Sequence, residues 1–113
     1  MAGINDAIEM RSADEFAIWL VANGVAAREV WVWIYKKASG KQVVGFGPLL
    51  ETALCHGWVD VQTKGIDEER YGIRFVPRRA GSNWSATNRA IVKRLRAEGR
   101  MAETGKALLP AEL

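Results

Sequence analysis

Apolar residues recur at helical spacing near the start of the chain, and this stretch has recognisable ends. Ser12 and Glu15 have the spacing of a capping box, in which each side chain accepts from the other residue's backbone N–H. Gly24 stands where a helix C-cap is favoured. We therefore predict a helix over 13–23. Its apolar stripe is formed by Phe16, Trp19 and Leu20.

Three further helices are predicted from residues that favour helix ends. Pro48 suits the first turn of a helix that Gly57 ends. Ser85 can cap a third helix that ends near Gly99, and a short last helix is predicted over 104–109. The inner face of the third helix is formed by Asn88, Ile91, Val92 and Leu95.

Three stretches have the composition of β-strands. Val30–Tyr35 is aromatic or β-branched at every position, as in a central strand that is buried on both faces. Trp58–Lys64 and Arg70–Pro77 are joined by a short polar link over 65–69, which predicts a hairpin. The element order is α-β-α-β-β-α-α. We predict an α+β fold in which helices cover a small three-stranded sheet, expected to be antiparallel.

The length of 113 residues fits one domain, which we place at 12–110 after a flexible N-terminal arm over 1–11. No apolar run is long enough to span a membrane. The N-terminus contains acids in place of the apolar segment of a secretory signal. Because there is also only one Cys, we expect a cytoplasmic protein without an internal disulfide.

The net charge is only +3, but it is unevenly distributed. The segment from Lys64 to Arg100 has ten Lys and Arg against four Asp and Glu, whereas the remainder has six against nine. An anionic partner is therefore expected to bind the second half of the chain.

The single Cys and the single His are adjacent, which at first suggests a catalytic pair. Neighbouring side chains near a helix end point about 100° apart and do not face each other. We therefore predict Cys55 to be a buried, inert core residue, and His56 has no second His with which to bind a metal. No catalytic residue, metal site or cofactor is assigned.

Asp60 lies among apolar residues of a predicted strand, so a buried carboxylate there needs a partner. Three downstream cations are candidates: Lys64, Arg74 and Arg78. One interpretation is a structural ion pair that holds the hairpin to the next loop. In the other, Asp60 orients an arginine of a binding site from behind.

The loop before the third predicted helix is the strongest binding candidate. Arg78 and Arg79 offer planar guanidinium groups that suit phosphate or carboxylate. Gly81 would let a ligand approach the backbone, and a helix start attracts anions. Trp84 can stack on a base, although we favour packing of the helix onto the core. The predicted ligand-binding residues are Asp60, Arg78, Arg79, Gly81, Ser82, Trp84 and Ser85.

Four segments resemble the bacterial YdeI/OmpD-associated proteins in order and spacing. They are FAIWLVANG, VWVWIYKKASGK, ETALCHGWVDVQTKGIDEERYGIRFVPRRAGSNWSATN and AEGRMAETG, within about residues 16 to 107. The chain departs from that pattern at His56, Val61 and Ala80, where relatives usually have an aromatic residue, Gly and Pro respectively. The predicted ligand-binding residues all match the pattern, as do Gly57 and Trp58.

This resemblance implies a link to protection against bacteriocins or cationic antimicrobial peptides, and hence to stress resistance. Some members of the family are described as periplasmic. Longer relatives have a further C-terminal helical segment, which we expect this chain to lack.

We expect a small non-enzymatic domain that binds an anionic small molecule or an acidic partner through its basic half. The first alternative is a nucleic-acid-binding module that uses the outer face of the third predicted helix, formed by Arg89, Lys93, Arg96 and Arg100. The second alternative is an enzyme that uses Asp60 in an arginine-lined pocket.

Overall fold

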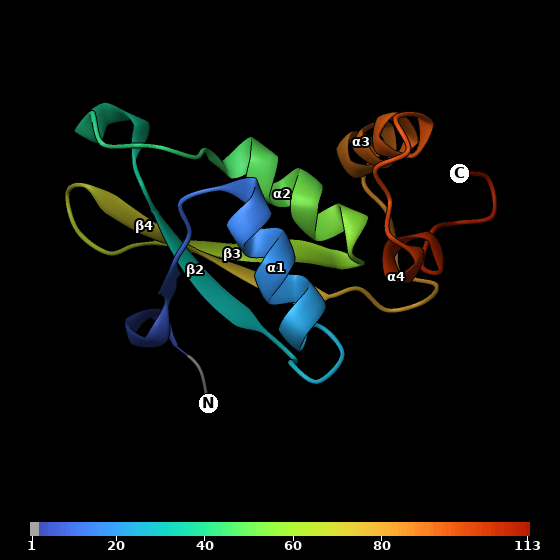
Figure 1. Ribbon diagram of the computed structural model, residues 1–113, viewed down its shortest axis with the longest axis horizontal. Helices are drawn as coiled ribbons and strands as arrows, with labels where there is room; N and C mark the ends of the chain where they lie inside the picture. Colours follow the sequence, from blue (N-terminus) through green and yellow to red (C-terminus); the bar gives the residue numbers. More distant parts are fainter. Residues whose placement is uncertain (1–2) are drawn as a thin grey trace.

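The computed structural model describes residues 3–113, which form an α+β fold with a mixed sheet (Figure 1). The helices are α1 (Ala13–Asn23), α2 (Phe46–Cys55), α3 (Ala86–Ala97) and the short α4 (Glu103–Lys106). The strands are β1 (Ile8–Glu9), β2 (Val30–Tyr35), β3 (Trp58–Gly65) and β4 (Arg70–Pro77). Two short 3-10 turns are η1 (Ile4–Asp6) and η2 (Lys37–Ser39).

The helix ends agree closely with the predicted ends where a side chain caps the helix. Ser12 Oγ accepts from the Glu15 N–H at 3.0 Å, and Ser85 Oγ accepts from the Asn88 N–H at 3.1 Å. The second helix begins two residues before Pro48, at Phe46. Proline is tolerated there because the N–H groups of a first turn have no partner within the helix. The last helix is shorter than the predicted 104–109.

The sheet has four strands in the order β1-β2-β4-β3, where three were predicted. The pairs β2–β4 and β3–β4 are antiparallel, as expected, but β1 pairs with β2 in parallel. The missed strand lies in the stretch that was predicted to be a flexible arm. Within this stretch Met10 is buried, whereas Asn5, Asp6, Ile8 and Arg11 are exposed. Two residues are too few for a strand pattern to be recognised in the sequence.

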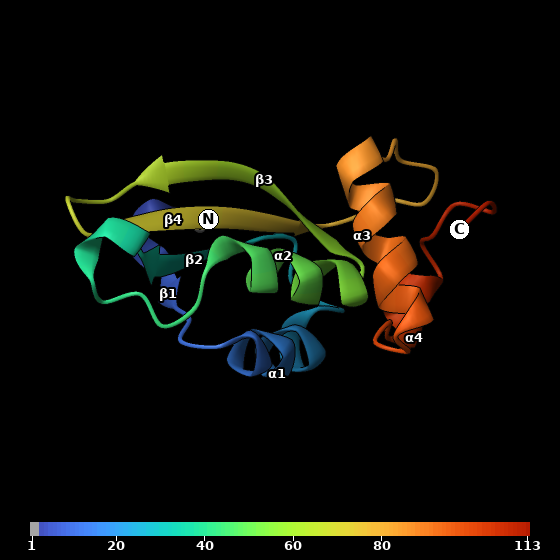
Figure 2. The same ribbon diagram turned by 90° about the horizontal axis from the view of Figure 1, so that it is seen from above.

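Helices α1 and α2 cover one face of the sheet, and α3 and α4 stand at its end (Figure 2). The main core lies between the sheet and helices α1 and α2. Its centre includes the ring pair Phe16 and Phe75, whose centroids are 4.9 Å apart. Other fully buried members are Val32, Ile34, Leu49 and Ile73. Trp19, which was predicted to belong to the apolar stripe, is only partly buried and packs edge-on against Trp58.

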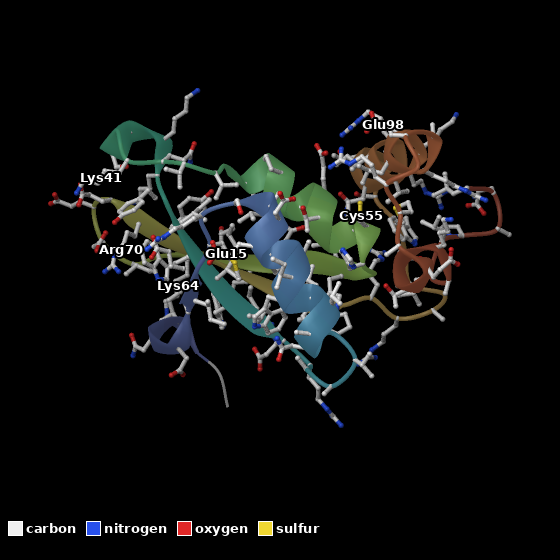
Figure 3. All side chains as sticks on the ribbon, in the orientation of Figure 1. Glu15, Lys41, Cys55, Lys64, Arg70 and Glu98 are labelled. Carbon is white, nitrogen blue, oxygen red and sulfur yellow. The ribbon has the colours of Figure 1, made fainter. Side chains whose placement is uncertain are left out.

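A second, smaller core joins α2 to α3. It contains Leu50, Leu54, Cys55, Val92, Leu95 and Met101. Figure 3 shows Cys55 at the end of α2 that lies beside α3. This core fixes α3, and with it the preceding loop, at one end of the sheet.

The sheet face opposite to α1 and α2 bears polar and aromatic side chains. Trp33 and Tyr35 meet edge-to-face with centroids 5.4 Å apart, and the Arg70 guanidinium lies 5.0 Å from the Trp33 ring centroid. A Cβ on Gly72 would collide with Ile4 of η1, so η1 packs closely over this part of the face.

Candidate functional site

A cleft of about 530 Å³ lies at the C-terminal end of β4. Four arginines line it, namely Arg28, Arg74, Arg78 and Arg79. Its apolar lining is formed by Ala27, Val61, Val76 and Pro77. We call this feature the arginine cleft.

The strands set the position of the cleft. Arg74 and Val76 alternate along β4 with the buried Ile73 and Phe75, so they face away from α1 and α2. The register of β3 against β4 shifts between Asp60 and Gln62, which leaves Val61 as the extra residue of a β-bulge. Val61 is exposed and lines the cleft.

The arginines of the cleft differ in how far their charge is already compensated. Arg74 Nε donates to Glu29 Oε1 at 2.8 Å. Arg28 and Arg79 are exposed, and neither forms an ion pair with any residue in 3–113. The cleft therefore retains an excess of positive charge.

Arg78 holds the loop together. Its backbone N–H donates to the Gly57 carbonyl at 2.8 Å. Its Nη2 donates to Ser82 Oγ at 3.0 Å and to the Asn83 carbonyl at 2.7 Å. The guanidinium stacks on Trp84 at 3.7 Å from the ring centroid, and burial lowers the pKa of Arg78. Its buried Nε has no hydrogen-bond partner within residues 3–113. Arg78 thus shapes the site and is not free to turn toward a ligand.

The loop divides the residues that were predicted to converge. Arg78 and Arg79 line a groove of about 300 Å³, Gly81 and Trp84 line another of about 200 Å³, and Ser82 lines both. The hydroxyl of Ser85 caps α3 and lines neither groove. A φ of +77° at Gly81 shows that the glycine serves the turn. Trp84 packs against the second core, as favoured.

Asp60 is not placed as either interpretation expected. It is partly buried on the sheet face that carries its register partner Phe75, whereas the arginine cleft opens on the other face. Among residues 3–113 it forms no hydrogen bond or ion pair with Lys64, Arg74 or Arg78. Arg74 pairs with Glu29 instead. The structure therefore gives no support to an enzyme that uses Asp60 in an arginine-lined pocket.

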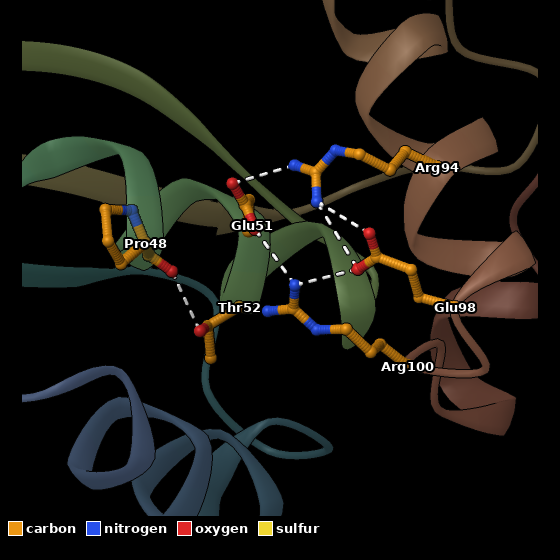
Figure 4. A network of polar contacts seen from close by, with 6 residues as sticks. All are labelled: Pro48, Glu51, Thr52, Arg94, Glu98 and Arg100. Carbon is orange, nitrogen blue, oxygen red and sulfur yellow. Dashed lines mark hydrogen bonds and ion pairs between the residues drawn. The ribbon is translucent and has the colours of Figure 1, made fainter.

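The basic face of α3 is partly neutralised by nearby acids. Arg94 and Arg100 share Glu51 and Glu98 in a network that joins α2 to the end of α3 (Figure 4). Arg89 pairs with Glu112 at 2.7 Å. Of the four residues predicted to contact nucleic acid, Lys93 and Arg96 alone form no ion pair within residues 3–113.

Cys55 and His56 lie in different surroundings. Cys55 is buried in the second core, as predicted, and burial raises the pKa of its thiol. His56 is half-buried, and burial lowers the pKa of its imidazole. It lines a separate cleft of about 280 Å³ beside the end of α1, which we call the α1 cleft.

Within 3–113, no group of three or more His, Cys, Asp or Glu side chains is placed to hold a metal ion. No helix in this range is both long enough and apolar enough to cross a membrane.

Reasoning from the sequence missed Arg28 and Val61 as site residues. Arg28 lies in the loop between α1 and β2, far from Arg79 in the sequence, so only the sheet order brings them together. Arg74 was considered only as a partner for Asp60. A strand position next to buried Ile73 and Phe75 was the available signal that Arg74 faces the uncovered side.

One comparison with known proteins gave a match. A family model described as a domain of unknown function, DUF8412, matches residues 8–108. It provides no link to the YdeI/OmpD-associated proteins. Neither the curated proteins nor the solved structures contained a significant match.

Proposed function

Because the chain belongs to the DUF8412 family, whose function is unknown, we propose a function from the site itself: the arginine cleft binds a small anionic ligand. The ligand has a phosphate or carboxylate attached to an apolar group. The protein binds it without catalysing a reaction.

The observation that carries this proposal is the gathering of four arginines around one open cleft. Two of them, Arg28 and Arg79, have no compensating carboxylate within residues 3–113. Like charges placed together repel one another, and an anion between them relieves this repulsion. Guanidinium groups also donate two parallel hydrogen bonds to phosphate or carboxylate, which adds geometric specificity.

The apolar lining indicates the rest of the ligand. Val61, Val76 and Pro77 expose apolar surface within the cleft, and free inorganic phosphate would leave that surface in water. Burying apolar surface contributes roughly 25 cal/mol per Å², so an aromatic or aliphatic group on the anion should strengthen binding. A cationic antimicrobial peptide does not fit, since the arginines would repel it.

Isothermal titration calorimetry with phenyl phosphate tests the proposal. Because the Arg79 guanidinium contacts the anionic group under this proposal, Arg79→Ala should weaken binding by about tenfold or more. Arg96→Ala is the matched control, because Arg96 is also an exposed arginine without an ion pair but lies on α3. It should leave the affinity within about twofold of the wild type.

Comparison of probes tests the ligand class. Phenyl phosphate should bind more tightly than inorganic phosphate, and phenol should not bind measurably. Equal losses for Arg79→Ala and Arg96→Ala would show a diffuse charge effect and would contradict a site at the cleft.

A further inference from the structure

The α1 cleft lies where three parts of the chain meet, and close packing fixes its walls. It is lined by the end of α1, by the turn from α2 into β3 and by the start of α4. A Cβ on Gly57 would lie 3.0 Å from the Thr104 carbonyl oxygen, and a Cβ on Gly105 would collide with the Cys55 carbonyl. The Ala102 N–H donates to the same Cys55 carbonyl at 3.0 Å. The cleft is therefore largely preformed, as small-molecule sites usually are.

The surface of the cleft is mainly apolar. Leu20 and Trp58, which are 3% and 2% exposed, line it from the core, and the exposed Val21 and Val25 line it from outside. Its volume is about 280 Å³. Since an apolar cavity of about 150 Å³ already accepts benzene, the α1 cleft has room for a molecule of one or two rings.

A buried polar group reaches this apolar surface without a partner. The indole N–H of Trp58 donates to no acceptor within residues 3–113. In the same range, the one unpartnered side-chain nitrogen or oxygen that is fully enclosed is Arg78 Nε, so the Trp58 N–H is open to the cleft.

Gly24 leaves this N–H uncovered. Trp58 Nε1 lies 3.4 Å from the position that a Cβ on Gly24 would take, and Gly24 also lines the cleft. A side chain at this position would collide with the Leu20 carbonyl. The glycine that closes the end of α1 therefore also keeps the indole donor accessible from the cleft.

We propose that the α1 cleft binds a small neutral molecule that has one or two rings and a hydrogen-bond acceptor. The acceptor binds the Trp58 N–H, and the rings pack on the apolar walls. This second site is separate from the arginine cleft and does not rest on the ligand proposed there.

The unpaired donor is the reason to expect an acceptor on the ligand. A donor in apolar surroundings that lacks a partner is costly, and an acceptor removes that cost. A water molecule could also accept this hydrogen bond, but it would leave the walls formed by Leu20 and Val25 in contact with solvent. A ring compound with an acceptor satisfies the N–H and covers these walls together.

The charges around the cleft favour a neutral ligand. Among the lining residues, Glu103 alone has an ionised side chain at pH 7, and this carboxylate disfavours an anion. It is 90% exposed and pairs with Lys106 at 3.4 Å, so it is turned to solvent and already compensated. Burial lowers the pKa of the His56 imidazole, which keeps this lining residue neutral at pH 7. A cation would lose its hydration against apolar walls.

A titration with acetophenone, which has one ring and a carbonyl acceptor, tests the site. In NMR spectra of labelled protein, the indole N–H signal of Trp58 should shift saturably. The indole signals of Trp31, Trp33 and Trp84, which do not line the cleft, should move little. A titration that leaves the Trp58 signal in place would overturn the proposal.

Trp58→Phe tests the hydrogen bond itself, because it keeps an aromatic ring and removes the donor. It should weaken acetophenone binding by about threefold to tenfold. Binding of α-methylstyrene, which has the same shape but a CH₂ group in place of the carbonyl oxygen, should stay within about twofold. Equal losses for the two probes would show that the indole N–H does not bind the acceptor, and the proposal would be wrong.

A variant that fills the cleft tests the location without changing Trp58. Ala102 lines the cleft and its side chain makes no capping hydrogen bond, so Ala102→Trp should abolish acetophenone binding. Ala90→Trp is the matched control, because Ala90 is exposed on α3 and does not line the cleft. It should bind like the wild type, and so should Arg79→Ala, which tests the arginine cleft alone. Acetophenone binding that survives Ala102→Trp would contradict the proposed site.

Discussion

At the scale of single residues, His56 shows how burial affects a titratable group. It is half-buried beside the apolar α1 cleft, and no hydrogen bond to its side chain is found within residues 3–113. Burial lowers the pKa of the imidazole from its ordinary 6.5. The unfolded chain therefore takes up this proton at a higher pH than the folded chain does.

Stability should consequently fall as the pH drops through the ordinary histidine range. Between about pH 7.5 and pH 5.5, the free energy of unfolding of the wild type should decrease, and that of His56→Phe should change much less. The carboxyl groups whose pKa is lowered, Asp67, Glu98 and Glu112, titrate below this window. Urea denaturation at several pH values measures the difference. Parallel pH profiles for the two proteins would mean that His56 is not the cause.

Some residue environments were also predictable from the sequence. Cys55 was correctly placed in a core because its helical neighbours Ala53 and Leu54 are apolar. The environment of Asp60 was not predicted correctly, because a strand pattern cannot show which cation lies within reach of the carboxylate. Arg74, the expected candidate on β4, instead pairs with Glu29, which lies in the loop before β2.

At the scale of elements, prediction succeeded where a local signal exists. Capping hydroxyls, glycines and β-branched runs act over a few residues, so α1, β2 and β4 were placed with the bounds that the structure has. Strand β1 is held only by its parallel pairing with β2. A strand of two residues is too short to show an alternating pattern in the sequence, so this long-range pairing could not be predicted.

The N-cap of α3 gives a prediction at this scale. Ser85 Oγ accepts a hydrogen bond from the Asn88 backbone N–H, which has no partner within the helix. Ser85→Ala should lower the free energy of unfolding by about 0.5–2 kcal/mol. Thr87→Ala is a suitable control, because Thr87 is exposed within α3 and caps nothing. Urea denaturation that shows equal effects for both variants would argue against the cap.

At the scale of the whole molecule, the uneven charge of the sequence has a structural basis. The basic segment contributes Arg74, Arg78 and Arg79 to the arginine cleft, while part of α3 is neutralised by Glu51, Glu98 and Glu112. The net charge alone could not distinguish these two surfaces. Their separation depends on the ion pairs that the fold creates across distant parts of the chain.

The most direct test of the central claim is a titration of labelled protein with phenyl phosphate, followed by amide chemical shifts in NMR spectra. We predict saturable shifts concentrated at residues 27–29, 61 and 74–79, which surround the arginine cleft. The amides of residues 89–96 on α3 should move little. Shifts centred on α3, or spread evenly over the basic half of the chain, would contradict the proposed site.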